Sequence, residues 1–223
     1  MILRAEKIAK WYYRKSGESN RFFAVSETDV QLESGSLTVL MGRSGSGKTT
    51  FLHMLGGLLI PDAGKVWVDD KDLYAMNDAE LSRYRNRHIG IVSQGHTAVQ
   101  SLSVLENVML PQMMYADTDR INESADEWLA RFGMEHLQEA FPSELSGGEL
   151  RRMSIARALA GKPEILLADE PTGDLDDENT QLVMKALREA ADEGTAVLVV
   201  THESDALDYA DQRWQMNAGV LTK

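Results

Sequence analysis

The amino-acid sequence predicts an α/β fold that combines a mainly parallel sheet, an antiparallel β patch near the N-terminus and an inserted helical subdomain. Short apolar runs of strand length alternate with helical segments along much of the chain, which is typical of α/β proteins. From about 95 to 161 the strand-like runs disappear and helical patterns dominate. We therefore expect one domain over 1–223, with its core at about 1–94 and 162–223 and the helical subdomain at about 95–161.

Uninterrupted apolar runs predict the buried parallel strands. A parallel strand that is covered on both faces is apolar throughout, because neither set of its side chains faces water. The runs of this kind cover 89–92, 165–168 and 196–200, and the mostly apolar segment 36–41 is expected to be a further buried strand that ends at a Gly-rich turn. The aromatic-rich segment 11–13 and the segment 65–69 alternate more, which predicts the antiparallel patch beside the main sheet.

A helix is expected directly after the first of these strands. Phe51, Leu52, Leu55 and Leu58 have the spacing of one helical face. The Pro-Asp-Ala-Gly run at 61–64 predicts that the helix stops near this point, because both Pro and Gly interrupt helices.

Composition and charge exclude several classes of protein. The chain has 23 Lys and Arg against 35 Asp and Glu, which gives a net charge of −12. A chain this acidic is a poor general binder of nucleic acid or anionic lipid, so we expect no nucleic-acid partner. It has no Cys, which excludes disulfides, thiolate metal sites and thiol nucleophiles. No apolar run approaches the roughly 20 residues that span a bilayer, so any membrane role is expected to come through another chain.

The segment 42–49 reads Gly-Arg-Ser-Gly-Ser-Gly-Lys-Thr and matches the P-loop pattern, with a predicted strand before it and a helix after it. Glycines let successive backbone N–H groups turn toward phosphate oxygens at the positive end of the helix. Lys48 adds a charge between the β- and γ-phosphates, and the Thr49 hydroxyl can bind Mg²⁺. A flexible turn is the alternative, but strand, spacing, Lys and Thr together favour a P-loop NTPase core. The predicted nucleotide-binding residues here are Gly42, Arg43, Ser44, Gly45, Ser46, Gly47, Lys48, Thr49 and Thr50.

Two carboxylates follow the apolar run 165–168 directly. Asp169 ends a buried strand next to the P-loop, where it can hold Mg²⁺ through the water shell of the ion. Glu170 can point at the γ-phosphate and orient or deprotonate the attacking water. Two acids at a strand end could also simply begin a surface loop, and the P-loop is what favours the functional interpretation.

A second helix start with anion-binding character lies at 145–149, Leu-Ser-Gly-Gly-Glu. Ser146 and Glu149 have the spacing of a capping box. A capped helix with a Gly-rich first turn is also an anion site. Because the chain already has a phosphate site about a hundred residues upstream, the second one makes most sense if it serves the nucleotide of another molecule.

These motifs, in this order and over essentially the whole chain, resemble the ATP-binding cassette (ABC) transporter family. The segment 42–49 is similar to the Walker A loop, 145–149 to the signature and 165–170 to the Walker B strand with its catalytic Glu. Two residues depart from the family pattern: Glu149 stands where Gln is commonest, and Ser93 precedes the Q-loop residue where an aromatic is frequent. The single residues that also match are Gln94 in the Q-loop, Asp176 in the D-loop, the switch histidine His202 and the adenine-stacking aromatic Tyr12.

The resemblance implies an ATPase that uses ATP and Mg²⁺ and works as a head-to-tail homodimer. Each ATP is then expected between the Walker A loop of one copy and the signature of the other. Gln94 would reach Mg²⁺, His202 the γ-phosphate and Tyr12 the adenine, with Trp11 and Tyr13 as rivals for that stacking role. A membrane permease is the implied partner, with the ATPase peripheral at the cytoplasmic face of the cell membrane. The signature residues expected to contact the opposite ATP are Ser146, Gly147, Gly148 and Glu149.

The run 170–176, Glu-Pro-Thr-Gly-Asp-Leu-Asp, is similar to one branch of the family. That branch contains macrolide exporters, lipoprotein-release ATPases, haem and antimicrobial-peptide efflux pumps and the cell-division ATPase. It implies an exporter or a mechanotransmission system. A cell-division-type ATPase that regulates wall hydrolases without transport, and an importer ATPase, stay as alternatives. The cargo is not predicted, because an ATPase subunit does not touch it.

A candidate docking segment for the permease lies at 101–115. Ser103 and Glu106 have capping-box spacing, which predicts a helix start. Within that helix we expect Met109 and Leu110 to pack the core. The next apolar residues lie beyond a Pro that is expected to break the helix, and two interpretations are open for them: core packing, or a flexible apolar groove that receives a partner helix. These residues are Met113, Met114 and Tyr115.

Overall fold

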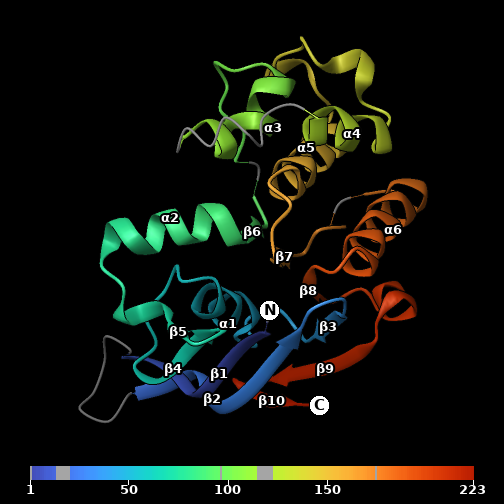
Figure 1. Cartoon of the computed structure of the whole chain (residues 1–223). Coiled ribbons are helices and arrows are strands. Elements are labelled where there is room, and N and C mark those ends of the chain that lie inside the picture. The colour runs from blue at the N-terminus through green and yellow to red at the C-terminus, as the bar shows by residue number, and fades with distance from the viewer. Residues whose placement is uncertain (1, 14–20, 96, 115–122, 174) are drawn as a thin grey trace.

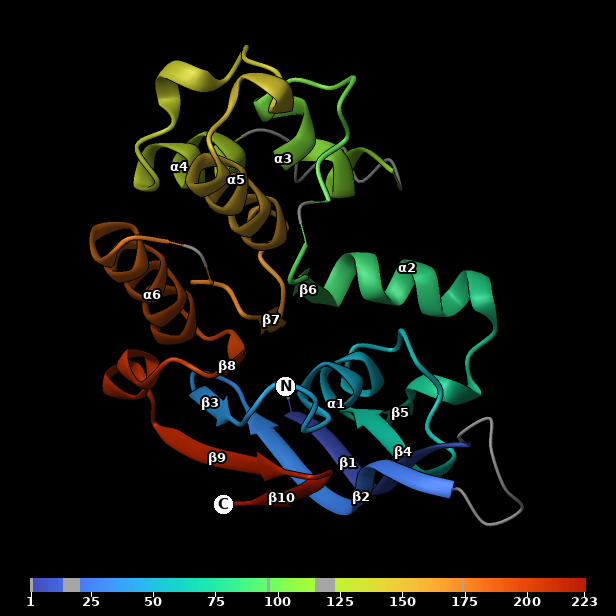
Figure 2. The same cartoon turned by 180° about the vertical axis from the view of Figure 1, so that it is seen from behind.

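The computed structural model describes residues 2–13, 21–95, 97–114, 123–173 and 175–223. The structure contains two sheets, of which the antiparallel one lies at the lower end of the view and the helices lie above it (Figure 1). A group of helices gathers at the end of the molecule opposite the antiparallel sheet, in both views (Figures 1 and 2). This arrangement confirms the predicted α/β fold with a mainly parallel sheet.

The larger sheet has six strands in the order β10-β9-β3-β8-β7-β6. The neighbours from β9 to β6 are parallel, and β10 is antiparallel to β9. The four predicted apolar strands are β3, β8, β7 and β6, which form the centre and one edge of this sheet. Its strands are β3 (Leu37–Met41), β6 (Ile89–Val92), β7 (Ile165–Asp169), β8 (Ala196–Thr201), β9 (Gln212–Asn217) and β10 (Val220–Thr222).

The smaller sheet is the predicted antiparallel patch, in the order β2-β1-β4-β5. Its two long strands form a hairpin in which Tyr12 pairs with Phe22. The strands are β1 (Ile2–Tyr13), β2 (Arg21–Glu33), β4 (Ala63–Val68) and β5 (Lys71–Asp72).

Helix α1 lies between the two sheets. Its Phe51 and Leu52 are fully buried in one apolar cluster with residues of both sheets, such as Leu3 and Leu198. A second cluster on the other face of the larger sheet includes Leu166 and reaches into the helices that follow β6. The helices are α1 (Lys48–Leu55), α2 (Asp78–His88), α3 (Val104–Met113), α4 (Glu123–Arg131), α5 (Gly147–Ala160) and α6 (Asp177–Asp192), with short 3-10 turns at Leu73–Ala75, Glu135–Leu137, Pro142–Glu144 and Ser204–Tyr209.

The expected end of α1 near Pro61 is wrong, because the helix ends at Leu55. Gly56 caps it, and Gly57 adopts the left-handed conformation with φ +68°, which turns the chain away from the helix. Leu58 therefore lies outside the helix and is 47% exposed. Helical spacing alone includes Leu58, whereas the backbone freedom of the Gly pair stops the helix before it.

The expected helix break at Pro111 is also wrong, because Pro111 lies inside α3. The predicted capping box of Ser103 and Glu106 fixes the start of this helix. Near its end, the amide of Gln112 donates to the carbonyl oxygen of Ala160 on α5 (2.6 Å). This tertiary contact helps to offset the loss of one backbone donor at Pro. Tyr115, the last residue of the candidate docking segment, lies outside the described residues.

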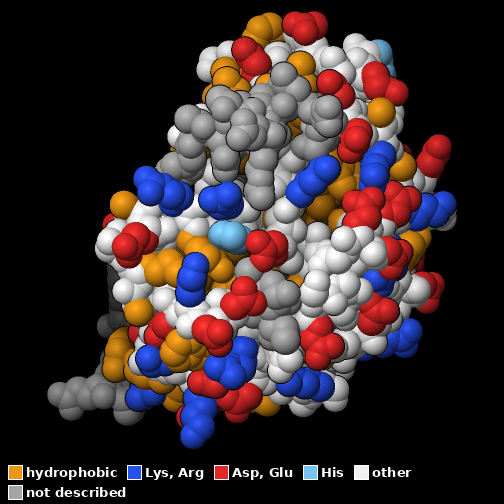
Figure 3. Space-filling view, in the orientation of Figure 1, with side chains coloured by type: hydrophobic (Ala, Val, Ile, Leu, Met, Phe, Trp, Pro, Cys, Tyr) orange, Lys and Arg blue, Asp and Glu red, His pale blue; other side chains and the backbone are white. Residues whose placement is uncertain are grey.

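Acidic and basic side chains are interspersed over the coloured part of the face in Figure 3. In the part of the chain that the structure describes, no helix combines the length and the apolar character needed to cross a bilayer.

Candidate active site

The predicted phosphate loop connects the end of β3 to the start of α1. Gly47 caps α1 in the left-handed conformation (φ +106°), without a side-chain hydrogen bond to the helix end. The first N–H groups of α1 are thus left for a ligand. A Cβ at Gly47 would collide with the carbonyl oxygen of Ala24, and one at Gly42 with that of Met216. Both positions therefore require glycine, because other backbone segments approach them closely.

A cleft of about 1150 Å³ opens over this loop. It brings together most of the residues that the sequence predicts for the nucleotide, although they come from strands, loops and a helix far apart in the chain. The predicted residues that line it are Tyr12, Arg43, Ser44, Gly45, Ser46, Gly47, Lys48, Thr49, Thr50, Gln94, Asp169, Glu170 and His202.

Lys48 and Ser46 show how the loop fits an anion. Lys48 is 6% exposed, and its Nζ donates to the carbonyl oxygens of Gly42 (2.6 Å) and Arg43 (3.2 Å). The Ser46 hydroxyl is buried and has no hydrogen-bond partner among the described residues. A buried polar group without a partner is costly. Phosphate oxygens would satisfy the Ser46 hydroxyl and the N–H groups at the start of α1, so these residues fit the triphosphate of a nucleotide.

Asp169 and Thr49 supply oxygen donors beside the phosphate loop. Asp169 ends β7 and is 2% exposed. Burial raises the pKa of this carboxyl, while a hydrogen bond with the Thr49 hydroxyl opposes the rise. Hydroxyl and carboxylate oxygens suit Mg²⁺, which usually takes few protein ligands together with phosphates and water. Among the described residues, no three His, Cys, Asp or Glu side chains gather into a metal site.

Glu170 follows β7 in a strained backbone conformation, with φ +48°. Its N–H donates to the carbonyl oxygen of Val200 (2.7 Å). Its Oε2 accepts a hydrogen bond from the Thr201 hydroxyl (3.1 Å) and lies 3.0 Å from Nδ1 of His202. Its Oε1 lies 3.8 Å from Nζ of Lys48. Strain of this kind persists only where neighbours hold it, and it is common at active sites.

His202 lies at the mouth of the cleft with its side chain 65% exposed. The hydrogen bond and the charge of Glu170 raise the pKa of this imidazole. The imidazole of His202 therefore holds a proton more readily than an unperturbed histidine does, at the mouth of the cleft.

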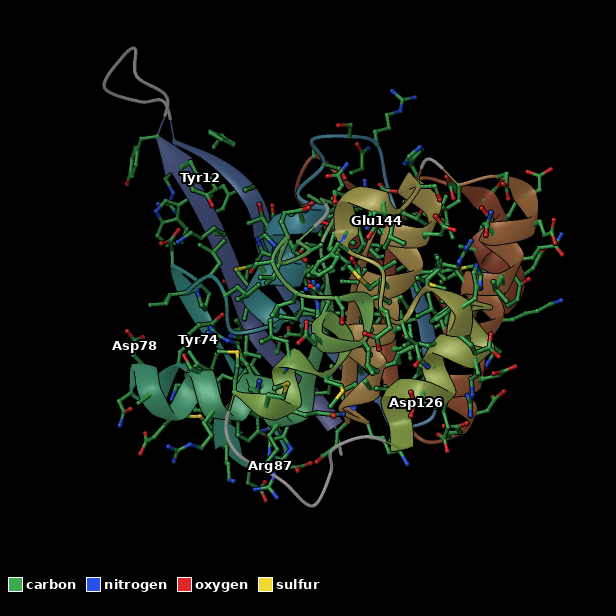
Figure 4. All side chains as sticks on the ribbon, turned by 90° about the horizontal axis from the view of Figure 1, so that it is seen from above. Tyr12, Tyr74, Asp78, Arg87, Asp126 and Glu144 are labelled. Carbon is green, nitrogen blue, oxygen red and sulfur yellow. The ribbon has the colours of Figure 1, made fainter. Side chains whose placement is uncertain are left out.

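Only one of the three candidate aromatics lines the cleft. Tyr12 is 40% exposed and lies on β1 close to the hairpin end (Figure 4). Trp11, the preceding residue of the strand, packs against Phe23 at 5.8 Å and under the guanidinium of Arg21 at 3.8 Å. Tyr13 is 74% exposed and is not among the residues that line the cleft. This geometry favours Tyr12 for stacking on a base.

The structure does not bring the signature to this cleft. The predicted capping box is present: Ser146 caps α5, and Glu149 accepts hydrogen bonds from the N–H and the hydroxyl of Ser146, both at 2.7 Å. The hydrogen bonds from Ser146 lower the pKa of Glu149. None of the residues 145–149 lines the described cleft. In Figure 4, Glu144, just before the signature, lies over the helices, away from Tyr12 on the hairpin.

Asp176 also lies outside the cleft, where it caps α6 by accepting a hydrogen bond from the N–H of Asn179 (2.8 Å). The hydrogen bonds from Asn179 lower the pKa of Asp176. Asn179 in turn accepts a hydrogen bond from Arg152 of α5. The start of α6 is therefore tied to the helix that begins at the signature.

The sequence analysis missed the part of the cleft that β2 and the β9–β10 turn provide. The Gly219 N–H donates to the carbonyl oxygen of Ser46 (2.8 Å), and the Ser26 N–H donates to that of Gly219 (2.7 Å). These contacts depend on the pairing of strands that are distant in sequence, and no local pattern indicates them. The missed residues are Phe22, Phe23, Ala24, Ser26, Ala218 and Gly219.

The fold and the cleft define an ATPase of the P-loop class, and comparison with known proteins gives the family. Residues 25–173 match the family described as "ABC transporter". The chain belongs to this family and is an ATP-binding, ATP-hydrolysing subunit of the ABC type, as the sequence predicted.

Several of the similar proteins are lipoprotein-release ATPases, one of the classes in the branch that the run 170–176 resembles. The lipoprotein-releasing system ATP-binding protein LolD of Shewanella sp. (strain MR-4) is 38% identical, over 99% of this chain and 95% of that protein. LolD of Saccharophagus degradans is 40% identical, over 87% of this chain and 86% of that protein. Among solved structures, the dimeric cassette MJ0796 in a post-hydrolysis state with ADP and Pi superposes with a TM-score of 0.90. It is 32% identical, with 99% of this chain and 97% of that one covered.

Proposed function

We propose that the chain hydrolyses ATP in a head-to-tail homodimer and thereby drives a membrane permease of the lipoprotein-release type. The observation that carries this proposal is the separation of two anion-binding helix starts in one chain. The cleft over α1 has the P-loop and the carboxylates, whereas the capped start of α5 lies outside it. A second copy would bring its own α5 to complete the site. The dimeric state of the similar cassette MJ0796 supports this arrangement.

Within one copy, each residue of the cleft has a separate task. Lys48 and the N–H groups at the start of α1 bind the β- and γ-phosphates. Glu170 accepts the proton of the attacking water, and Thr201 and His202 hold its Oε2 in place. Tyr12 stacks on the adenine. The fixed orientation of these groups supplies the positioning on which phosphoryl transfer depends.

Thr49, Gln94 and Asp169 are the residues that would hold Mg²⁺, with Asp169 acting through water. When bound, Mg²⁺ neutralises charge on the β- and γ-phosphates. Thr49 and Asp169 already lie within hydrogen-bonding reach of each other, and Gln94 lines the same cleft.

The partner copy supplies the other half of the site from its signature. The N–H groups of Gly147 and Gly148 offer donors to the opposite γ-phosphate at the positive end of α5. The Ser146 hydroxyl donates to Glu149 in the single chain, so it would donate to the phosphate in exchange for that hydrogen bond, while Glu149 keeps its hydrogen bond from the Ser146 N–H. Asp176 begins α6 beside this surface and would lie at the interface between the copies.

We further propose the domain boundaries and the location of the chain. The core would cover about 1–94 and 162–223, and the helical subdomain about 95–161, in one domain of 223 residues. The permease would hold the chain peripherally at the cytoplasmic face of the membrane. Co-purification with a permease that a neighbouring gene encodes tests the partner. A large extracytoplasmic domain in that permease would support the lipoprotein-release branch.

The composite site is tested with Gly148→Asp. A Cβ at Gly148 would lie 3.5 Å from Leu175 and 3.9 Å from Arg152, so the single chain accepts a side chain here without a clash. The new carboxylate would instead repel the opposite γ-phosphate. Nucleotide binding to the monomer should persist, while ATP-driven dimerisation and hydrolysis are lost. Gly161→Asp, at the far end of α5 with no atom within 4 Å of its Cβ, is the matched control.

Sedimentation of each variant with and without ATP measures dimerisation, and a fluorescent ATP analogue measures binding. Lys48→Ala provides the opposite pattern, because it removes the phosphate-binding charge and should lose nucleotide affinity itself. A Gly148→Asp variant that dimerises with ATP as well as the parent would show that the head-to-tail arrangement is wrong.

A further inference from the structure

Arg151 is a buried arginine of α5 whose side chain reaches the segment that carries Gln94. It is 5% exposed. Its Nη1 donates to the carbonyl oxygen of Ser93 (2.8 Å), and its Nη2 donates to that of Gln94 (3.0 Å). The planar guanidinium fixes the direction as well as the distance of both partners, and hydrogen bonds from a charged donor are stronger than neutral ones. One side chain of α5 therefore holds two consecutive carbonyl groups of the loop.

The backbone around Gln94 has little regular structure of its own. β6 ends its pairing with β7 at Val92, and Gln94 lies in a bend beyond it, exposed and on the cleft. A Cβ added at Gly95 would meet no atom within 4 Å, so packing against neighbours does not fix the backbone at that point. The direction in which the Gln94 side chain leaves the backbone thus depends on how Arg151 holds the peptide groups.

Arg151 also lies close to the signature along α5. Ser146 caps this helix, and Arg151 comes little more than one turn later. A shift of the helix start toward a partner's nucleotide would therefore move the backbone of Ser93 and Gln94, because both carbonyl groups are hydrogen-bonded to the planar guanidinium of Arg151.

We propose that Arg151 is a positioning residue that links the signature helix to Gln94. Through it, the half of the site offered to the partner's ATP and the half that holds the chain's own ATP adopt their active positions together. The inference rests on the proposed role of Gln94 at the nucleotide and adds the residue that couples that role to α5.

Two other contacts hold the loop after Gln94 and provide a contrast. Arg157, also on α5, donates to the carbonyl oxygen of Thr97 (2.9 Å) and to its hydroxyl. Asn107 of α3 exchanges hydrogen bonds with the backbone of Val99 (2.8 and 3.0 Å). These anchors fix the path of the loop without bonding to Ser93 or Gln94.

The experiment compares Arg151→Met and Arg151→Lys with the parent chain, using Arg157→Met as the matched control. We expect Arg151→Met to lower kcat about 10- to 100-fold, the range for a displaced catalytic constellation, with unchanged affinity for a fluorescent ATP analogue. Arg151→Lys keeps the charge and one hydrogen bond and should recover part of kcat. Arg157→Met should lose thermal stability to a similar extent but keep kcat. If Arg151→Met does not fold, Arg151→Lys carries the same comparison.

Gln94→Ala and the double variant with Arg151→Met separate this inference from the proposed function. If Arg151 acts through Gln94, the double variant should be no slower than Gln94→Ala alone. A Gln94→Ala variant with parent kcat would remove the role of Gln94 and the inference with it. If Gln94→Ala lowers kcat but Arg151→Met does not, the positioning role of Arg151 is wrong while the proposed function stands. The same conclusion follows if the losses of kcat multiply in the double variant, or if Arg157→Met loses kcat as much as Arg151→Met does.

Discussion

At the scale of single residues, the carboxylate of Glu170 is held from several sides. Its N–H is bonded to Val200, and its Oε2 lies against Thr201 and His202. The left-handed backbone at Glu170 is strain that these neighbours maintain. In the proposed role of base, Glu170 would therefore need no further ordering before it accepts the proton of the attacking water.

Glu170→Gln is therefore expected to abolish most of the chemistry and leave binding intact. The amide keeps the size of the side chain but cannot accept the water proton, and loss of a positioned base costs about 10²- to 10⁴-fold in kcat. ATP should still bind, and the uncleaved nucleotide should hold the dimer together. Steady-state ATPase assays and sedimentation with ATP measure the two effects. Hydrolysis at the parent rate would remove Glu170 from the role of base.

Tyr12→Ala tests the base-binding end of the cleft. Loss of a stacking contact costs about 1–3 kcal/mol, which corresponds to a weakening of ATP affinity by roughly 5- to 150-fold. Since Tyr12 does not contact the carboxylates, kcat at saturating ATP should change little. Tyr13→Ala is the control, because Tyr13 is more exposed and lies outside the cleft lining. Equal losses in the two variants would contradict the assignment of the stacking role to Tyr12.

At this scale, local motifs predict the phosphate loop and the strand-end carboxylates, because their spacing along the chain sets their geometry. Tyr12 could be predicted only together with its rivals. The choice among them depends on which face of β1 lies against the cleft, and the pairing with β2 decides that. Phe22, opposite Tyr12 in this pairing, could not be found for the same reason.

At the scale of elements, two capping boxes of the same chemistry serve different purposes. Ser103 with Glu106 begins α3, and Ser146 with Glu149 begins α5. Neither serine lines the cleft of its own chain, and we assign to Ser103 the role of a cap alone. Ser146 is a cap and, in the proposed dimer, would donate to the opposite ATP in exchange for its hydrogen bond to Glu149.

Ser103→Ala and Ser146→Ala should consequently lower stability to the same extent, but only Ser146→Ala should reduce activity. Removing either cap is expected to lower the free energy of unfolding by about 1 kcal/mol. Only Ser146→Ala should also lower the ATPase rate of the dimer. Urea unfolding and ATPase assays on both variants provide the comparison. A Ser103→Ala variant that stays stable but loses activity would contradict this separation of roles.

Strands that are buried on both faces could be predicted from the sequence, whereas β9 and α2 could not. β3, β6, β7 and β8 have apolar sequences because the sheet is covered on both sides there. β9 alternates between buried Trp214 and Met216 and exposed neighbours, so it has no apolar run. α2 buries only Leu81 among its residues, and its remaining signal is the capping box of Asn77 and Glu80.

At the scale of the whole molecule, the end of α3 lies where several elements meet. Asn86 of α2 donates to the carbonyl oxygen of Pro111 (2.8 Å), and Gln112 donates to Ala160 of α5. Met113 and Met114 follow directly and are 53% and 65% exposed. Core packing therefore does not account for these two residues, whereas Met109 does pack against the core as predicted.

Exposed methionines beside a junction of helices suit a surface that receives a helix of the permease. Met side chains are flexible and polarizable and adapt to the shape of a partner. Met113→Gln with Met114→Gln should leave the free subunit folded and able to bind ATP, because polar substitutions on the surface change stability by only about 0.5 kcal/mol or less. The double variant should be recovered poorly with the permease from membranes and should lose stimulation of its ATPase activity by the permease.

Val220→Gln is the matched control for this double variant, since Val220 is 52% exposed on β10, at the edge of the sheet opposite β6. Thermal unfolding of the free subunits and co-purification with the permease separate folding from docking. Unfolding of the free double variant would indicate that these methionines support the fold after all. Normal recovery and stimulation in a stable double variant would place the docking surface elsewhere on the molecule. Loss of coupling in the double variant, with normal coupling in Val220→Gln, would locate it at the end of α3, beside Asn86 of α2 and Ala160 of α5.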